Sequence, residues 1–278
     1  MKKNRLCSIV IPVYKDHIDR YEELSFRQCM KILNRYVIFL VTYEPLDLSV
    51  YEGIANEYQA QLCKMFFSKD YFSGIAGYNK LMKSKQFYQS FDTFEYILIY
   101  QLDAFVFRDE LEFWCKQGYD YIGAPWFSEF GEKKDASDLW RVGNGGFSLR
   151  RVSYFINVLS RKLPLMKYKW VISMNNINLL KKPFYMLGWR NNIDYYVKTE
   201  QEMNEDIFFS LLLHNSYVSP VLPDVEVAAL FAFDKSPSWL YNFVGNKLPF
   251  GCHAFRKNEF DEFWKPFIDN DEIVSYNS

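Results

Sequence analysis

Apolar runs of strand length alternate with longer segments over the first 107 residues of the chain. Four runs predict strands, at residues 8–13, 36–42, 62–68 and 96–102. The segments between them predict helices, at residues 16–35, 51–61 and 73–91. This alternation is typical of an α/β fold with a mostly parallel, doubly wound central sheet, flanked by helices and joined by right-handed crossovers.

The fourth run, YILIYQLDAFVF at residues 96–107, is the centre of the pattern. Six of its first seven residues are apolar or aromatic, which predicts a strand buried on both faces. The run reaches Asp103, and ligands of open α/β sheets bind outside the carboxyl ends of the strands. Asp103 is therefore a candidate for chemistry. The alternative is that it ends the strand or caps the helix predicted near Arg108.

The pattern becomes mixed after Phe107. Helices are predicted at residues 108–117, 150–160 and 204–214, strand-like segments at 119–126, 147–149 and 220–233, and a polar loop at 127–139. Asn204 is the expected N-cap of the third helix. Residues 161–198 are basic, aromatic and interrupted by proline, and no arrangement is predicted for them. Without repeats or an evident linker, we expect one domain over residues 1–278, with halves 1–107 and 108–278.

Composition excludes several classes of protein. The formal net charge is −1, which does not favour nucleic-acid binding. The five cysteines are scattered and show no CxxC spacing, which is typical of free thiols in a reducing compartment. No GxGxxG or GxxxxGK[ST] motif follows a predicted strand, which argues against dinucleotide oxidoreductases and P-loop enzymes. We expect a cytoplasmic protein without a signal peptide.

Aromatic residues are in surplus, at 19% of the chain. Most must lie in the core, but such a number also leaves flat faces that can stack on sugars or bases.

Four stretches, taken together, resemble the GT-A-type glycosyltransferases. They are SIVIPVYK at residues 8–15, ILIYQLDAFVF at 97–107, VGNGGFSLR at 142–150 and NEDIFFS at 204–210. With GYDYIGAPW at 118–126, the pattern is also similar to an uncharacterised bacterial glycosyltransferase-like family found with surface-polysaccharide genes. The resemblance implies a nucleotide-sugar-binding half at residues 1–107 and an acceptor-binding, catalytic half at 108–278, with a smaller mixed part on the acceptor side.

The resemblance also implies a donor site. Its nucleotide-sugar-binding residues would be Pro12, Tyr14, Lys15, Gln101, Asp103, Asn144, Gly145 and Gly146. Lys15 departs from the Asn or Asp more usual in this fold. The alternative for the three glycine-segment residues is a tight turn. Arg150 and Arg151 are candidates either for phosphate contacts or for a solvated helix start.

A metal ion, Mn²⁺ or Mg²⁺, would neutralise the diphosphate leaving group in such an enzyme. Asp103 would supply one ligand. The position of the family's second Asp holds Phe105, so the resemblance points to His253, in PFGCHAF, as the other ligand. The alternative for His253 is a hydrogen-bonded histidine in an aromatic cluster. His17 and His214 have no comparable context.

Transfer of a sugar to an acceptor hydroxyl needs a base. Glu205 and Asp206 are neighbours, so in a helix their side chains diverge by about 100° and can have different roles. By resemblance Asp206 is the expected base and Glu205 the second choice. The alternative is that both complement the helix dipole. Trp126 is the candidate stacking platform for an acceptor sugar, or a buried tryptophan.

The implied function is inverting, hexosyltransferase-like transfer from a UDP-sugar to a glycan or glycolipid acceptor during surface-polysaccharide biosynthesis. One alternative is a catalytically degenerate GT-A-fold carbohydrate-binding protein. A nucleotidyltransferase is a third hypothesis, opposed by the lack of a glycine- and Lys/Arg-rich loop after the first strand. Residues 161–198 are a candidate for peripheral contact with the inner face of the membrane. The oligomeric state is left open.

Overall fold

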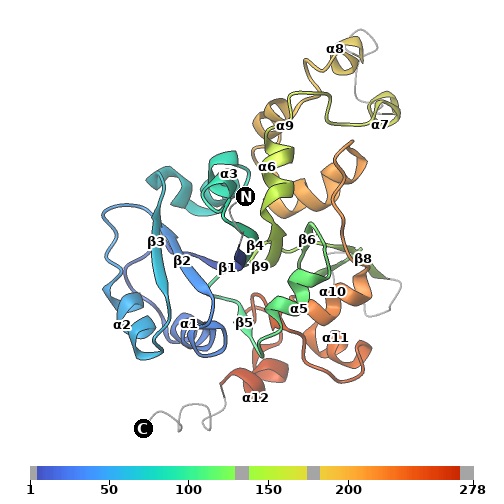
Figure 1. Ribbon diagram of the computed structural model, residues 1–278. Helices are drawn as coiled ribbons and strands as arrows, with labels where there is room; N and C mark the ends of the chain where they lie inside the picture. The colour runs from blue at the N-terminus through green and yellow to red at the C-terminus, as the bar shows by residue number, and fades with distance from the viewer. Residues whose placement is uncertain (1–4, 129–137, 174–181, 270–278) are drawn as a thin grey trace.

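A computed structural model describes residues 5–128, 138–173 and 182–269 of the protein. Its centre is a six-stranded sheet in the order β3-β2-β1-β4-β9-β6 (Figure 1). The strands are β1 (Arg5–Pro12), β2 (Val37–Thr42), β3 (Leu62–Phe66), β4 (Phe94–Tyr100), β6 (Tyr121–Ile122) and β9 (Phe147–Arg151). The first four run parallel, while β9 is antiparallel to both β4 and β6. The prediction of a mostly parallel central sheet in an α/β fold is confirmed.

Both faces of the sheet are buried under helices, as the continuous apolar strands predict. Side chains of β1 and β4 alternate between two core clusters, so that Leu98 faces one side and Ile97 and Ile99 the other. The first face is covered by α1 (Arg20–Leu33), α2 (Ser49–Glu57) and α5 (Leu111–Lys116). The second face is covered by α3 (Gly74–Met82), α4 (Lys85–Gln89) and α6 (Val152–Leu159).

Two helices begin or break where polar side chains bind the backbone. The helix predicted at residues 16–35 starts only at Arg20, because Asp19 accepts hydrogen bonds from the Tyr21 and Glu22 N–H groups in a capping box. The helix predicted at 73–91 is two helices. The Ser84 side chain accepts from the N–H of Phe87 and starts α4 after a break in the chain.

The second half differs more from the predictions. Residues 220–233 are not extended throughout, because α10 (Val225–Phe231) occupies half of them and buries Ala228, Ala229 and Phe231. The helix predicted from Arg150 starts at Val152, since Arg150 and Arg151 are the last residues of β9. The helix at 204–214 is present but is wound as a π-helix, η4 (Ile207–Leu211), followed by a 3₁₀ turn, η5 (Leu212–Asn215).

Two small sheets complete the second half. Strands β10 (Ala232–Phe233), β11 (Gly251–Cys252) and β5 (Phe105–Val106) form one, and β7 (Pro125–Phe127) pairs with β8 (Leu139–Val142). Helices α11 (Pro237–Phe243) and α12 (Lys265–Ile268) and the π-helix η6 (Phe260–Trp264) pack around the first. Most of the loop predicted at 127–139 lies outside the described residues.

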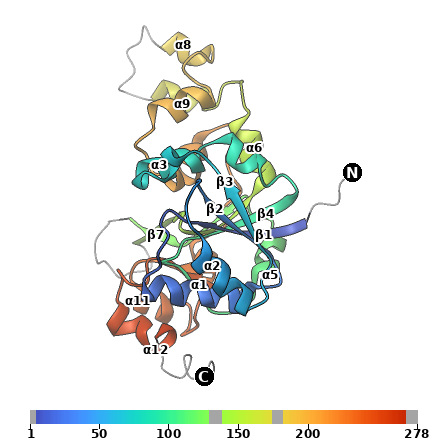
Figure 2. The same cartoon turned by 90° about the vertical axis from the view of Figure 1, so that its left-hand side faces the viewer.

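Helices α7 (Tyr168–Ser173), α8 (Lys182–Met186) and α9 (Ile193–Thr199) form a lobe that projects from the sheet (Figures 1 and 2). Buried Leu165, Val171 and Ile193 extend the core from α6 into this lobe. We call it the α7–α9 lobe. Among the residues that the structure describes, no helix has the length and apolar character needed to cross a membrane.

Candidate functional site

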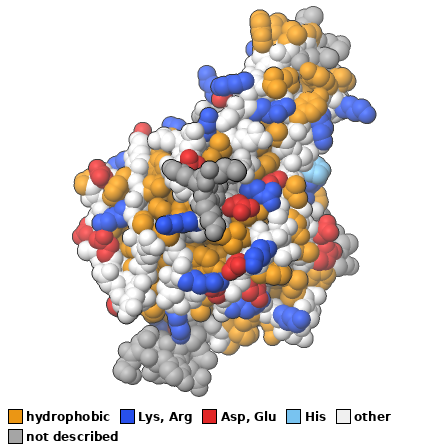
Figure 3. Space-filling view, viewed as in Figure 1, with side chains coloured by type: hydrophobic (Ala, Val, Ile, Leu, Met, Phe, Trp, Pro, Cys, Tyr) orange, Lys and Arg blue, Asp and Glu red, His pale blue; other side chains and the backbone are white. Residues whose placement is uncertain are grey.

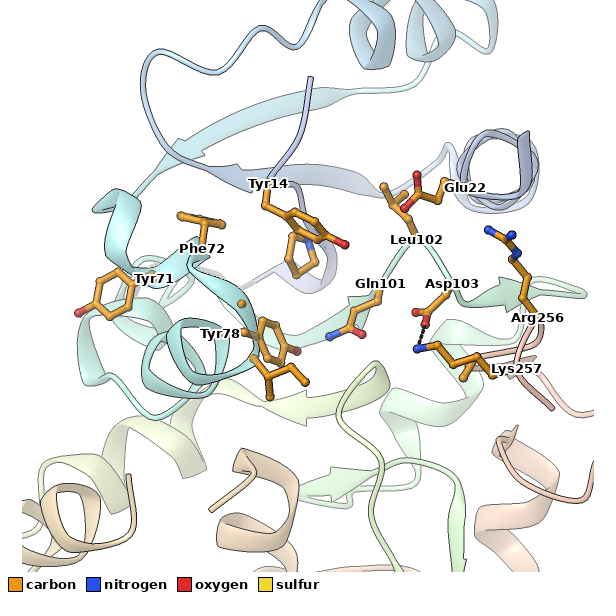
Figure 4. A pocket seen from close by; sticks show the side chains of 14 residues that line it. Tyr14, Glu22, Tyr71, Phe72, Tyr78, Gln101, Leu102, Asp103, Arg256 and Lys257 are labelled. Carbon is orange, nitrogen blue, oxygen red and sulfur yellow. Dashed lines mark ion pairs between the residues drawn. The ribbon is translucent and has the colours of Figure 1, made fainter. Parts of the chain in front are cut away.

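A cavity of about 680 Å³ opens at the carboxyl ends of β1 and β4. Aromatic side chains gather on one side of it and charged side chains on the other, with Gln101 between them (Figure 4). The aromatic side chains are Tyr14, Tyr71, Phe72 and Tyr78, and the charged ones are Glu22, Asp103, Arg256 and Lys257. The volume lies within the range of small-molecule sites.

Asp103 lies at this edge and has a cationic partner at each oxygen. Its Oδ1 is 3.1 Å from Nε2 of His253, and its Oδ2 is 3.6 Å from Nζ of Lys257. Burial alone would raise the pKa of Asp103, but His253 and then Lys257 outweigh it and lower the pKa to about 2. Asp103 is therefore an anion at neutral pH. The side chain of Lys257 is 76% exposed, so its ammonium group is accessible to a ligand.

The three-stranded sheet explains why residues 150 positions apart meet. Cys252 of β11 pairs with Phe105 of β5 in antiparallel register, which places His253 beside the chain that carries Asp103. Phe233 of β10 pairs with Cys252 in parallel, so Asp234 also reaches His253, with Oδ1 3.6 Å from Nδ1. Asp234 was missed in the sequence, although it follows a short apolar run, as Asp103 does.

His253 lies between two carboxylates. Burial disfavours its charged form, but the hydrogen bonds and charges of Asp103 and Asp234 outweigh burial and raise the pKa of His253 to about 10. Phe105 occupies the position where the GT-A motif has its second Asp. Its ring is buried in the third core cluster, against Phe107 and Phe255.

The pair Asp103 and His253 has a spacing that suits two ligands of one metal ion. Ligands at right angles on an ion with bonds of about 2.1 Å lie about 3.0 Å apart, and the two facing atoms are 3.1 Å apart. Within the described residues, no group of three or more His, Cys, Asp or Glu side chains could hold a metal ion. A cation such as Mg²⁺ or Mn²⁺ bound to this pair would need further ligands, such as phosphate oxygens and water.

The N-terminus of α1 supplies Glu22 to the charged wall and holds Arg256 in place. Arg256 donates to Oδ2 of Asp19 over 2.8 Å, and its guanidinium lies 4.4 Å from the centre of the Tyr21 ring. Lys15 forms an ion pair of 2.7 Å with Glu22. Lys15 is therefore bound to a residue that lines the cavity and does not line it itself. Arg256 and Lys257 were missed, although two adjacent cations follow the predicted His253.

The glycine-rich segment lies between His253 and Glu205. A Cβ on Gly146 would come within 2.0 Å of Nε2 of His253, and one on Gly145 within 1.8 Å of Oε1 of Glu205. Asn144 has φ of 61° and accepts the Gly146 N–H on its side-chain oxygen, forming a tight turn. The glycines are thus required for close packing of two candidate functional side chains.

Glu205 is buried against Arg150. Its Oε1 accepts from Nη2 of Arg150 over 2.7 Å, and the two side chains are 2% and 0% exposed. Burial raises the pKa of Glu205 by more than the Arg150 charge lowers it. Arg150 therefore neither lies at a solvated helix start nor reaches the cavity, and both interpretations of it from the sequence were wrong. Arg151 is half-buried and pairs with Asp120 over 3.0 Å.

Asp206, like Glu205, faces Gly145 of the glycine-rich segment. Its Oδ1 accepts the N–H of Ile207 over 2.8 Å. Burial raises the pKa of Asp206, and the N–H groups of Ile207 and Gly145 oppose that rise. The segment before it is held by α3, since Asn79 accepts the Glu205 N–H and donates to the side chain of Asn204.

The structure thus places the predicted residues in two groups. Pro12, Tyr14, Gln101 and Asp103 line the cavity. The second group does not line the cavity and is connected to it by the hydrogen bond from the Gln101 N–H to the Gly146 carbonyl; it consists of Asn144, Gly145, Gly146, His253, Glu205 and Asp206. Trp126 is partly buried, and its ring packs on Gly143. The chemical roles assigned to all of these residues stay predictions.

Comparisons with known proteins give a family and several distant structural similarities. The model of the family described as "Protein of unknown function (DUF5672)" matches residues 61–253. No curated protein matches the chain in sequence.

Among solved structures, the chain is similar to the glycosyltransferase GlyE of Streptococcus pneumoniae TIGR4, with 12% identity and a TM-score of 0.48, covering 90% of this chain and 54% of that one. It is also similar to residues 1–349 of S. aureus TarS, with 10% identity and a TM-score of 0.37, covering 67% and 56% of the two chains. A complex of that TarS fragment with UDP gives 10% identity and a TM-score of 0.35, covering 55% and 48%. The chain spans about half the length of these proteins. At these TM-scores the likeness does not establish a shared fold.

Proposed function

The chain belongs to the family described as protein of unknown function (DUF5672), and we propose that it is a GT-A-type glycosyltransferase. It would move a sugar from a nucleotide-sugar donor, a UDP-sugar, to a glycan or glycolipid acceptor in surface-polysaccharide assembly, with inversion. One observation carries the proposal. A single cavity at the carboxyl ends of parallel strands combines an aromatic wall with a wall that bears Asp103, Arg256 and Lys257.

This combination suits a nucleoside diphosphate. A base can stack on Tyr14, which is 57% exposed, or on the rings of Tyr71 and Phe72. The diphosphate would then face Arg256 and Lys257, whose charges stabilise the negative charge that develops as the anomeric bond breaks. The ion pair of the exposed Lys257 with Asp103 contributes little to stability, so exchanging Asp103 for a phosphate costs little.

A divalent cation fits the same place. Asp103 and His253 would hold Mn²⁺ or Mg²⁺, and the ion would supply further neutralisation of the diphosphate when bound. His253 must lose its proton to become a ligand, so metal binding and proton release are linked at this site.

Asp206 is the proposed base. The acceptor hydroxyl transfers its proton to the Asp206 carboxylate, its oxygen bonds to the anomeric carbon, and the bond from that carbon to the diphosphate oxygen breaks. Burial raises the pKa of Asp206 and so makes it a stronger base than an exposed Asp. Glu205 is bound to Arg150 and would instead keep the segment that carries Asp206 in position. Trp126 remains the proposed platform for the acceptor.

Thermal unfolding with nucleotides and nucleotide sugars tests the donor site. A ligand present at 100 times its Kd stabilises the folded protein by about 2.7 kcal/mol, which raises the Tm by several degrees. We expect such a shift with UDP and its sugars, larger with Mn²⁺ or Mg²⁺ than with EDTA. Replacing Lys257 by Ala should weaken UDP binding by about tenfold or more, while Lys265→Ala, an exposed Lys on α12, should leave it unchanged. Absence of a shift with every nucleotide would refute a donor site here.

Turnover tests the chemistry separately. Asp206→Asn should retain donor binding and lose transfer by about 100-fold or more. Full transfer activity in that folded variant would show that Asp206 is not the base. Binding of a glycan without consumption of any nucleotide sugar would instead favour a carbohydrate-binding protein on a degenerate fold, which the buried Phe105 at the second Asp position makes a real alternative.

A further inference from the structure

The α7–α9 lobe exposes large apolar side chains. Leu187 and Trp189 are each 72% exposed, Leu163 is 64% exposed and Phe184 is 44% exposed. The lobe also has an interior, in which Val171 and Ile193 are almost fully buried. The four exposed side chains are therefore left outside although their neighbours are packed. Exposed apolar clusters of this kind mark interaction sites.

The turn after α8 is built to present two of these side chains. Leu187 N–H donates to the Pro183 carbonyl, and the Arg190 N–H donates to the Phe184 carbonyl. Gly188 has φ of 82°, which reverses the chain between Leu187 and Trp189. The Phe184 and Trp189 rings lie 5.7 Å apart. The apolar cluster is thus a defined surface.

The stretch of sequence that contains the lobe, residues 161–198, is strongly positive. Residues 161–198 contain eight Lys and Arg residues and one acidic residue, Asp194, which is a formal charge of +7 in a chain of net charge −1. The remaining residues therefore carry −8. Asp194 pairs with Lys162 over 2.9 Å. Lys167, Lys169 and Arg190 are exposed and have no ion pair among the described residues.

We propose that the α7–α9 lobe docks on the surface of an anionic lipid bilayer, with Leu187 and Trp189 inserted at the level of the headgroups. Trp favours this interfacial zone, and Lys and Arg can reach anionic headgroups while apolar neighbours insert. An aliphatic side chain such as Leu187 gains nothing from stacking on bases, so the surface fits lipid better than nucleic acid. The lobe projects from the sheet, and hydrophobic and basic side chains gather over it (Figure 3), so it can reach a flat surface.

Vesicle co-sedimentation of the full chain tests this without reference to sugar transfer. We expect binding to phosphatidylcholine vesicles that contain phosphatidylglycerol, weak binding to phosphatidylcholine alone, and release at high salt. Changing Leu187 and Trp189 together to Ser should weaken binding by at least about tenfold. Phe113→Ser is the matched control, because Phe113 is 54% exposed on α5, outside the lobe. Lys167→Glu with Lys169→Glu should weaken binding by about fivefold or more for each residue.

Several results would overturn the proposal. The first is no binding to anionic vesicles at low salt. The second is that the double variant Leu187→Ser with Trp189→Ser has the same Tm as the wild type and binds the vesicles equally well. The third is equal or tighter binding to an RNA duplex. Sedimentation that shows self-association lost in the same double variant would assign the surface to a second copy of this chain instead.

Discussion

Replacing Glu205 by Gln would test whether the segment behind the cavity is held by a buried ion pair. Arg150 is fully buried and uses its guanidinium completely. Nη2 donates to Glu205 and to the Gly145 carbonyl, Nη1 to the Tyr88 hydroxyl and the Met82 sulfur, and Nε to the Ser148 hydroxyl. The amide side chain of the variant would preserve the shape and one hydrogen bond, and would remove only the compensating negative charge.

The distance between the two groups determines the size of the effect. At 2.7 Å and an effective dielectric constant of about 20, the gross attraction is about 6 kcal/mol. Part of it offsets the cost of burying both charges. Removing one partner of a buried pair leaves the other uncompensated and typically destabilises a protein by about 3–5 kcal/mol. We expect a loss of this size in the free energy of unfolding.

Urea unfolding followed by circular dichroism measures that loss, provided the m-value is unchanged. Glu202→Gln is the matched control, because Glu202 is exposed three positions earlier, and it should change stability by less than about 0.5 kcal/mol. The double variant Arg150→Met with Glu205→Leu should recover most of the loss. A loss below about 1 kcal/mol for Glu205→Gln would refute the reasoning, since it would mean that Glu205 is uncharged in the folded protein.

Three further predictions concern the same region. Lys83→Met should destabilise the protein by about 2–4 kcal/mol, because the buried ammonium donates to three backbone carbonyls of residues 200–203; an unfolding curve like that of wild type would contradict this. NMR titration should show the imidazole of His253 losing its proton near pH 10. Asp103→Asn should lower that pKa, because an anionic partner of the imidazolium is lost. An unchanged titration midpoint in the variant would mean that Asp103 does not stabilise the protonated form of His253. Since the folded-state pKa of His253 is raised, its stabilising contribution is complete below about pH 6.5 and is lost as the pH rises through 10. Gly146→Ala should displace His253 and weaken metal-dependent UDP binding more than metal-free binding, since its Cβ would lie 2.0 Å from Nε2; equal binding would show that the ring has room to move.

Local pattern accounts for most of the central sheet. Strands β1 and β4, which end at Pro12 and Tyr100, are mostly apolar and buried. A strand buried on both faces is a continuous apolar run, so it can be predicted from its own residues without knowing which strands it pairs with. The place of Asp103 at a strand end followed from the same run. The break at Ser84 and the late start at Arg20 depend on single hydrogen bonds to side chains, which hydrophobic spacing does not register.

The second half follows the local pattern less closely, because its elements are short and are stabilised by distant partners. Arg150 and Arg151 have the polarity of a solvated segment, yet Arg150 is buried because Glu205, 55 positions later, compensates its charge. Strands β5, β10 and β11 have two residues each, too few for a periodic pattern. Asp234 reaches His253 only through the register of those strands.

The sequence alone determined where the four parallel strands of the first half lie, and that residues 161–198 carry a concentrated positive charge. These are properties of neighbouring residues. Only the tertiary structure decided which charges meet, that Lys257 reaches Asp103, and that Leu187 and Trp189 stay outside the core of the α7–α9 lobe. The physical reason is that burial and ion pairing depend on side chains far apart in the chain, whose encounter is set by packing and strand register.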